Sequence, residues 1–309
     1  MTQEPLIHAR GLTKRFDGRT AVDGIDVDVA RGEAFGLLGP NGAGKTSTMR
    51  MIGCVSPVTG GALRVLGMDP EADGPRIRAR LGVVPQDNAL DTYLTARDNL
   101  HIYGRYFGLS RRLVRERVGE LLEFVQLTER ADDRVDALSG GMRRRLVIAR
   151  SLINEPEILL LDEPTTGLDP QARHLLWDRL VRLKQRGATL VLTTHYMDEA
   201  EQLCDRLVVM DDGRIVAEGS PRALIERFST PEVLELRLGE GRHDATARLV
   251  EDLARRVEVL PDRLLLYVDD GDQALVAVHD RGVEPVSCLV RRTTLEDVFL
   301  RLTGRTLVD

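Results

Sequence analysis

The sequence predicts an α/β fold with a largely parallel sheet, followed by a small C-terminal α+β domain. Short apolar stretches alternate with segments of helical spacing along most of the chain, which is typical of successive βαβ units. One stretch, residues 158–161, is apolar at every position, as expected for a strand that is buried on both faces. From about Ser229 onward this regular alternation gives way to short strands and helices in a different order.

The first domain is predicted over residues 1–228, with a helical subdomain over about 87–154. Apolar runs and apolar–polar alternation predict strands at residues 6–12, 25–29, 34–38, 63–66, 81–84, 158–161, 189–193, 207–210 and 215–218. Helical spacing predicts helices at residues 44–52, 95–125 with a break near 108–110, 139–153, 172–185, 198–203, and after Pro221, where the last helix would close the domain.

The second domain is predicted over residues 229–309. Strands are expected at residues 233–238, 264–268 and 286–290, and helices at residues 244–256 and 295–302. This segment contains no group of residues that is typical of catalysis. We therefore expect a small α+β module with a regulatory or dimer-stabilising role.

Composition narrows the class of protein. The 309 residues carry a formal net charge of −6, which argues against nucleic-acid binding by charge alone. Arg143, Arg144 and Arg145 point in different directions at helical spacing, so we expect a solvated helix face or a contact with a partner chain. The three cysteines form no CxxC pair, which favours a reducing compartment. No apolar stretch reaches the roughly 18 residues of a membrane span, so we expect a cytoplasmic protein whose membrane role requires another chain.

Residues 39–46 fit the phosphate-binding pattern GxxxxGK[ST] in full, between an apolar strand and a helical segment. Glycines let backbone N–H groups turn around a phosphate, and the helix N-terminus adds partial positive charge. Lys45 can reach the β- and γ-phosphates, and the Thr46 hydroxyl can bind Mg²⁺. The nucleotide-binding residues predicted in this loop are Gly39, Pro40, Asn41, Gly42, Ala43, Gly44, Lys45, Thr46 and Ser47.

Two acidic residues and a histidine follow predicted strands of the same sheet. Asp162 and Glu163 come directly after the fully apolar strand, at the edge where parallel sheets bind ligands. Asp162 is placed to hold the Mg²⁺ shell, and Glu163 to act as a general base on the attacking water. His195 follows the next strand and could bond the γ-phosphate or that water.

Residues 138–142 read LSGGM and separate this chain from other classes of P-loop protein, because they resemble the LSGGQ signature of ABC ATPases. Phe16 matches the aromatic residue that stacks on adenine in that family, where tyrosine is commoner, and Gln86 matches the Q-loop. Independently of the resemblance, Ser139, Gly140 and Gly141 present a hydroxyl and unhindered N–H groups at a helix start, which suits an anion.

The remaining family motifs occur in the expected order. Asp162 and Glu163 match the Walker B aspartate and catalytic glutamate, Asp169 matches the D-loop, and His195 matches the switch histidine. The resemblance covers residues 6–228 and implies ATP and Mg²⁺ as cofactors. It also implies a homodimer that holds two ATP molecules, each between the P-loop of one chain and Ser139 of the other. The implied catalytic residues are Glu163, His195, Gln86 and Lys45, the implied nucleotide contacts outside the P-loop are Phe16, Ser139, Gly140, Gly141 and Asp169, and the implied metal ligands are Thr46, Gln86 and Asp162.

Three longer segments resemble the ABC-2 exporter group, which includes nodulation-factor and daunorubicin-resistance ATPases. These segments are residues 139–146, 192–197 and 295–304. The resemblance implies an ATPase at the cytoplasmic face of the membrane that drives a separate permease and exports a drug, as in multidrug efflux, or a lipid or lipo-oligosaccharide. The alternatives are an importer ATPase and a soluble ABC ATPase that acts on ribosomes or DNA. The single P-loop and the short spacing between Lys45 and Ser139 argue against the latter.

Overall fold

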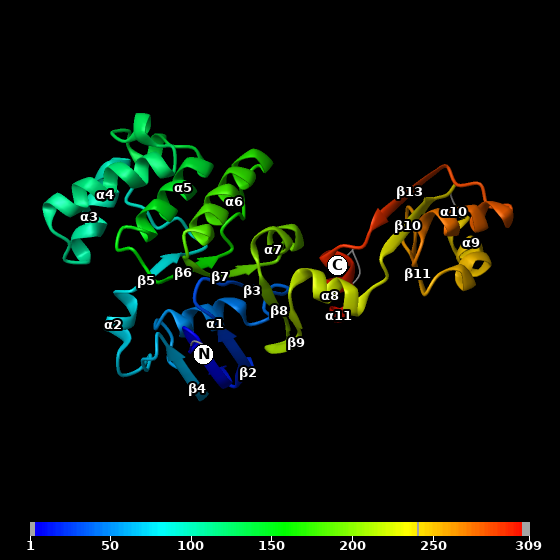
Figure 1. Ribbon diagram of the computed structural model, residues 1–309, viewed down its shortest axis with the longest axis horizontal. Coiled ribbons are helices and arrows are strands. Elements are labelled where there is room, and N and C mark those ends of the chain that lie inside the picture. The colour runs from blue at the N-terminus through cyan, green and yellow to red at the C-terminus, as the bar shows by residue number, and fades with distance from the viewer. Residues whose placement is uncertain (1–3, 240, 305–309) are drawn as a thin grey trace. The chain divides into compact units, whose positions relative to one another are not determined.

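The computed structural model describes residues 4–239 and 241–304, so residues 1–3, 240 and 305–309 of the predicted domain ranges lie outside the described residues. The chain divides into two compact units, residues 1–218 and 219–309 (Figure 1). The division precedes helix α8 (Pro221–Phe228), which packs against helix α11 (Leu295–Thr303) of the second unit. The sequence had suggested residue 229, with this helix at the end of the first domain.

A six-stranded sheet forms the centre of the first unit, with the strand order β5-β6-β7-β3-β8-β9. The first five strands in this order pair in parallel, which confirms the predicted α/β fold. Because they are parallel, the segments that follow β3, β5, β6 and β7 meet at one edge of the sheet. The strands are β3 (Ala34–Leu38), β5 (Leu81–Val84), β6 (Ile158–Asp162), β7 (Thr189–Thr194), β8 (Arg206–Asp211) and β9 (Arg214–Gly219).

A second, antiparallel sheet of three strands has the order β2-β1-β4 and shares a core with the central sheet. Its strands are β1 (Ile7–Phe16), β2 (Arg19–Val29) and β4 (Gly60–Val65). Apolar side chains from both sheets, such as Leu12, Val27 and Phe35, are fully buried in this core. The sequence predicted these strands but not their separation into a sheet of their own.

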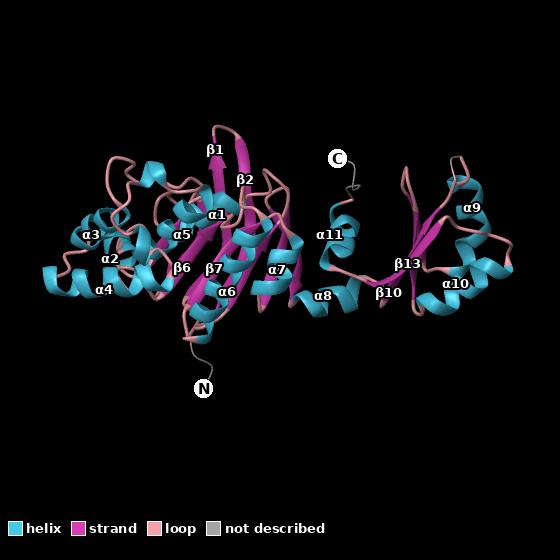
Figure 2. Ribbon diagram, turned by 90° about the horizontal axis from the view of Figure 1, so that it is seen from above, coloured by secondary structure: helices cyan, strands magenta, loops and turns pink. Residues whose placement is uncertain are grey.

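Helices of the first unit fall into two groups. The first group, α1 (Lys45–Ile52), α2 (Gly74–Arg78), α6 (Pro170–Gln185) and α7 (Met197–Leu203), lies around the sheets, and Figure 2 shows α6 and α7 beside the central strands. Helix α2 is a single short turn and was not predicted. None of the helices in the described part of the chain combines the length and apolar character that a membrane span requires.

The second group of helices forms a subdomain with its own apolar core. It consists of α3 (Ala96–Tyr106), α4 (Arg111–Phe124), the 3₁₀ turns Thr128–Arg130 and Val135–Ala137, and α5 (Gly140–Ser151). Each helix begins at a hydroxyl that accepts a hydrogen bond from a backbone N–H three residues later: Thr95, Ser110 and Ser139. Such caps satisfy donors that the helix itself leaves unpaired, and typically stabilise it by about 1 kcal/mol.

The second unit contains a four-stranded antiparallel sheet with the order β11-β12-β10-β13. Helices α9 and α10 cover one face and bury apolar residues such as Val250 and Val278 against it (Figure 2). The elements are β10 (Glu232–Arg237), α9 (His243–Val250), the 3₁₀ turn Glu251–Leu253, β11 (Arg256–Val259), β12 (Leu264–Val268), α10 (Gly271–Asp280) and β13 (Ser287–Arg292).

The helix predicted over residues 244–256 is wrong in its second part. Helix α9 ends at Val250, and Arg256 already belongs to strand β11. The Arg255 N–H donates to the carbonyl of Tyr267, and the next residues pair with β12. Pairing with a distant strand therefore overrides the local helical spacing.

Candidate functional site

A cavity of about 450 Å³ lies at the edge of the central sheet where the parallel strands end. The P-loop after β3, the segment after β5 and the acidic pair at the end of β6 all reach this edge. The residues that line the cavity are Phe16, Arg19, Ala21, Asn41, Gly42, Ala43, Gly44, Lys45, Thr46, Ser47, Gln86 and Glu163.

The P-loop can follow its path only because two positions lack a side chain. A Cβ atom at Gly39 would lie 2.5 Å from the carbonyl oxygen of Met210. Gly44 has a φ of 101°, and a Cβ atom there would lie 2.4 Å from the carbonyl oxygen of Ala21. The loop is therefore held tightly against neighbouring backbone at both ends, which keeps its N–H groups available around a phosphate-sized space.

Lys45 is folded back into the loop. Its Nζ donates to the carbonyl oxygens of Gly39 at 2.7 Å and Pro40 at 3.0 Å, and the residue is 5% exposed. Burial lowers the pKa of the Lys45 ammonium, although the charges of Glu163 and Asp162 oppose this. A partly desolvated cation held by neutral carbonyls is well placed to bind a phosphate anion.

Asp162 joins the P-loop to strand β7. Its Oδ1 accepts hydrogen bonds from the hydroxyls of Thr46 at 3.3 Å and Thr193 at 2.5 Å. A hydroxyl beside a carboxylate supplies the hard oxygen donors that Mg²⁺ prefers, so these residues fit the ion. Among the described residues no three His, Cys, Asp or Glu side chains form a metal cluster.

Glu163 has a strained backbone. Its φ is 46°, in the left-handed region, where a residue other than glycine costs about 1–3 kcal/mol. Its N–H is held by Thr193, both by the hydroxyl at 3.0 Å and by the carbonyl oxygen at 3.2 Å. The neighbouring fold therefore imposes this conformation, which turns the carboxylate toward the cavity.

The Glu163 carboxylate lies among three polar side chains. Its Oε2 accepts hydrogen bonds from Thr166 Oγ1 at 3.2 Å and from Gln86 Nε2 at 3.4 Å. Its Oε1 lies 3.3 Å from Nδ1 of His195, and that buried nitrogen makes no hydrogen bond to the described residues. The structure thus brings Gln86, Glu163 and His195 together, although they follow three different strands.

Four predicted site residues lie elsewhere. Ser139, with Gly140, is exposed at the start of α5, and its hydroxyl accepts from the Met142 N–H at 3.3 Å. Asp169 is exposed at the start of α6 and accepts from the Ala172 N–H at 2.9 Å. Neither these residues nor Gly141 line the P-loop cavity as the structure describes it.

The chain resembles known proteins over nearly its whole length. It is 48% identical to the Nod factor export ATP-binding protein I of Ralstonia nicotianae, over 99% of this chain and 96% of the relative. It is 49% identical to the protein of the same name from a Rhizobium species, over 97% of both chains. Residues 22–166 match the model of the ABC transporter family, and residues 242–304 match that of the C-terminal domain of the nodulation factor export protein NodI.

The chain belongs to the ABC transporter ATP-binding protein family. The resemblance predicted from the sequence is therefore confirmed. Solved structures agree: a dimeric ATP-binding cassette bound to ADP and Pi matches with a TM-score of 0.64 and 27% identity, covering 69% of this chain and 98% of that one. The protein cbiO1 from Clostridium perfringens, part of an ABC transporter complex, matches with a TM-score of 0.68 and 28% identity, covering 72% and 92%.

One residue of this ABC ATPase is placed quite differently from the prediction. Arg144 is not on a solvated helix face: it is 3% exposed and donates to backbone carbonyls around the site. The prediction was wrong because Arg144 shares a helix face with Val147 and Ile148, which are buried in the core. That spacing of three and four residues was a signal in the sequence. The sequence analysis also missed Thr193, which lies near the end of strand β7.

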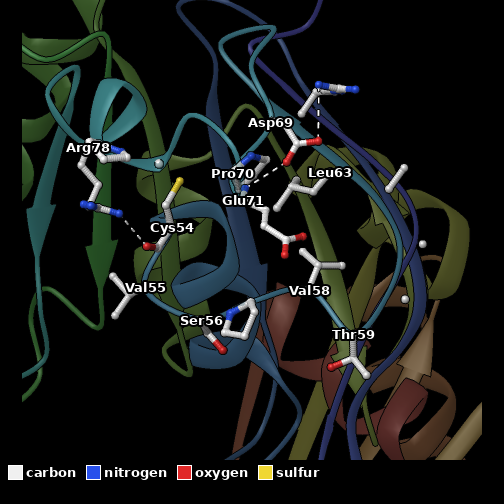
Figure 3. A pocket seen from close by; sticks show the side chains of 17 residues that line it. Cys54, Val55, Ser56, Val58, Thr59, Leu63, Asp69, Pro70, Glu71 and Arg78 are labelled. Atoms are coloured by element: carbon white, nitrogen blue, oxygen red, sulfur yellow. Dashed lines mark hydrogen bonds and ion pairs between the residues drawn. The ribbon is translucent and has the colours of Figure 1, made fainter.

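A larger groove of about 590 Å³ in this ABC ATPase lies away from these residues, between α1, β4 and α2 (Figure 3). Its polar groups bind one another: Arg78 donates to the Cys54 carbonyl, and Arg64 lies 3.5 Å from Asp69. The P-loop cavity differs because it gathers the buried cation of Lys45 and the strained carboxylate of Glu163, and His195 Nδ1 lies 3.3 Å from that carboxylate. We therefore take the P-loop cavity as the functional site.

Proposed function

We propose that this chain is the ATP-hydrolysing motor subunit of an ABC exporter. The observation that supports this best is the meeting of Gln86, Glu163 and His195 at the P-loop cavity, next to the contact between Thr46 and Asp162. This arrangement contains a phosphate cradle, oxygen donors for Mg²⁺ and a carboxylate that can accept a proton. The relatives that match over nearly the full chain are named as export ATP-binding proteins.

Each residue has a defined task in the proposed reaction. The P-loop N–H groups and Lys45 bind the phosphates, and Phe16 stacks on the adenine. Thr46, Asp162 and Gln86 would hold Mg²⁺, which neutralises charge on the transferring phosphoryl group. Glu163 accepts a proton from the attacking water. His195, whose Nδ1 is free of other partners among the described residues, holds that water or the γ-phosphate in line.

A second copy of the chain would complete each site. Ser139 and Gly140 are exposed at a helix start and Gly141 beside them is half-buried, yet these residues do not line the chain's own cavity. In a two-fold homodimer this surface of one copy would meet the ATP bound to the other. Asp169, exposed at the start of α6, would lie in the same interface. ATP would then join two chains, and its hydrolysis would release them.

The partner in the membrane would be a separate permease of the ABC-2 type. The proposed location is the cytoplasmic face of the membrane, where the ATPase binds peripherally through that permease. The names of the relatives favour a cargo of the Nod-factor class, a lipo-oligosaccharide, over a drug or a simple lipid.

The experiment that tests this proposal is a pull-down from detergent-solubilised membranes with tagged Glu163→Gln protein and ATP. A polytopic membrane protein identified by mass spectrometry, absent when Lys45→Ala is used instead, would support the exporter motor. Ribosomal or DNA-repair proteins without a membrane partner would contradict it. An importer would be recognised by co-purification of a soluble substrate-binding protein.

A further inference from the structure

Arg144 binds the backbone on both sides of the proposed catalytic carboxylate. Its Nε donates to the carbonyl of Pro164 at 2.7 Å, and its Nη2 donates to those of Asp162 at 3.1 Å and Glu163 at 3.0 Å. These three carbonyls belong to consecutive residues of the turn in which Glu163 has its left-handed conformation. The planar guanidinium group, with donors in fixed directions, can hold such a turn more rigidly than a lysine.

The same guanidinium group also binds the segment that carries Gln86. Its Nη1 donates to the carbonyl oxygens of Pro85 and Gln86. The side chain of Gln86 in turn donates to the Glu163 carboxylate. One buried side chain therefore fixes the main chains of two residues whose side chains meet in the active site.

The charge of Arg144 is compensated in an unusual way. Within the described part of the chain, its five hydrogen bonds go to neutral carbonyls rather than to a carboxylate. Burial lowers the pKa of the guanidinium to about 10, against the effect of Glu199, Asp162, Asp87 and Glu163, so it remains a cation at neutral pH. The carbonyls it binds are consequently held by charge-assisted hydrogen bonds, the stronger kind.

Arg144 also lies on the helix that begins at Ser139. The two residues are five positions apart, so the Arg144 backbone lies roughly 7.5 Å along the helix axis from the exposed helix start. A displacement of α5 would move the turn at Glu163 and the segment at Gln86 together. In the proposed homodimer the start of α5 faces the ATP bound to the other copy.

We propose that Arg144 is a positioning residue for hydrolysis and couples each ATP site to occupancy of the other. This inference rests on the proposed function, because it requires ATP hydrolysis and a shared site at Ser139. When ATP of the partner copy draws in α5, the guanidinium carries that movement to Glu163 and Gln86 of its own chain. Without Arg144, ATP still binds, but the Glu163 carboxylate is not held where it can accept a proton from the attacking water.

The test compares Arg144→Lys and Arg144→Met with Arg145→Met in the full-length protein. Arg145 is the matched control, because it donates to a single carbonyl, that of Val125, away from the site. The rate of ATP hydrolysis is measured against ATP concentration to give kcat and a Hill coefficient. The Kd for ATP and the melting temperature are measured on the same samples.

We expect Arg144→Lys, which keeps the charge but loses the planar fork, to lower kcat at least tenfold, since a misplacement of about 1 Å can cost 10²-fold. Its Kd for ATP should change less than about threefold (under 1 kcal/mol of binding free energy), and its Hill coefficient should fall to one. Arg144→Met should behave likewise or more severely, and Arg145→Met should match the wild type. Arg144→Lys decides the matter if Arg144→Met does not fold.

Three results would overturn the inference. The first is a kcat and Hill coefficient of Arg144→Lys equal to those of the wild type. The second is an equal loss in Arg145→Met, with kcat and melting temperature falling and the Kd for ATP rising together, which indicates a structural role only. The third is a wild-type Hill coefficient of one, which removes the coupling. A wild-type chain without ATPase activity would defeat the proposed function as well, so the two failures can be told apart.

Discussion

Glu163 shows how the fold prepares a single residue for chemistry. The left-handed backbone is held by Thr193 on one side and Arg144 on the other, and both contacts involve the main chain. The carboxylate itself makes long side-chain contacts of 3.2–3.4 Å, to Thr166, Gln86 and His195. The position of the carboxylate is thus fixed through its backbone, while its oxygen atoms remain free to accept a proton.

Replacing Glu163 with glutamine should therefore stop turnover without loss of ATP binding. The amide cannot act as a general base, and losing one typically costs about 10²–10⁴-fold in rate. The P-loop contacts and Lys45 are unchanged, so the Kd for ATP should stay within about twofold, less than 0.5 kcal/mol. Phosphate release and nucleotide binding would be measured on the same sample.

Glu157→Gln is the matched control for this substitution. Glu157 precedes strand β6, at the opposite end from Glu163, and forms ion pairs with Arg80 and Arg31 on the surface. The kcat of the Glu157→Gln variant should equal that of the wild type. An ATPase rate of Glu163→Gln above one tenth of the wild-type rate would refute the role of general base.

We expect Phe16 to contribute to binding the adenine base of ATP rather than to the hydrolysis step. The ring is 48% exposed at the end of β1, lines the cavity, and lies 4.7 Å from Nζ of Lys14. Phe16→Ala should weaken ATP binding about two- to tenfold through the lost stacking of about 0.5–1.5 kcal/mol. The kcat at saturating ATP should be nearly unchanged, and Phe16→Tyr should restore the affinity. A fall in kcat with unaltered Kd would contradict this assignment.

At the scale of the element, most strands and helices could be predicted because their signals are local. Strand β6, whose first four residues are all apolar, and the capped helix α3 are examples. Helix α10 was not anticipated, and Arg256 was assigned to a helix although it lies in β11. In the second unit, short elements acquire their structure from cross-strand pairing with β12, and such pairing is not visible in a window of ten residues.

The same reason explains which parts of the site were predictable. The P-loop, Asp162, Glu163 and His195 follow from motifs at strand ends. The inward direction of Arg144 and the positive φ of Glu163 could not be predicted in this way, because both depend on which segments the fold brings together. Motifs thus identify the residues, whereas contacts between distant segments determine how they are held.

In the second unit, helix α11 carries a buried carboxylate whose removal should change stability. Asp297 in α11 is 4% exposed, and its carboxylate binds both terminal nitrogens of Arg291 in β13 at 2.7 and 2.9 Å. It also accepts from the Thr294 N–H, at the start of the same helix. Burial raises the pKa of Asp297, but Arg291 and Thr294 outweigh it, so the pKa lies below 3.8.

Asp297→Asn should lower the free energy of unfolding of this unit by about 1.5–3 kcal/mol at pH 7, because Arg291 loses charge-assisted hydrogen bonds to a buried carboxylate and keeps only its ion pair with Glu235 among the described residues. Because the pKa of Asp297 is lower in the folded than in the unfolded chain, its ionised form stabilises the fold at pH values above the unfolded pKa of 3.8. This stabilisation is lost as the pH falls through the pKa of the folded state. The difference between wild type and variant should therefore narrow below about pH 4. Amide hydrogen exchange over β10, β12 and β13 would measure it.

The exposed pair of Arg255 and Asp269 provides the control for this measurement. Their side chains are 70% and 60% exposed, and such pairs contribute little to stability. Asp269→Asn should leave exchange over the same strands within experimental error at both pH values. A difference for Asp297→Asn that is constant from pH 7 to pH 3 would show that the carboxylate charge is not responsible.

At the scale of the whole molecule, the described structure separates two halves of one proposed site. The P-loop cavity holds the groups for binding and hydrolysis, and the start of α5 presents the exposed Ser139 and Gly140 on the surface. If these two halves do not meet within one chain, a second copy of the chain can bring its α5 start to the P-loop cavity of the first. Each chain would then contribute to two ATP sites, which makes dimerisation and nucleotide binding a single linked equilibrium.

This linkage gives a prediction with a close control inside the same chain. Glu163→Gln protein should form a dimer in ATP but not in ADP, as measured by analytical ultracentrifugation. Adding Ser139→Arg should weaken that dimer at least about a hundredfold, because a hydrogen bond to a charged phosphate, worth about 1.5–3 kcal/mol, is lost at each of two sites.

Adding Ser110→Arg instead removes an equivalent exposed helix cap, that of α4. This second double variant should dimerise normally, since α4 has no predicted contact with ATP. Equal dimerisation of all three proteins would show that the start of α5 is not in the interface, and would direct attention to the second unit as the dimerising element.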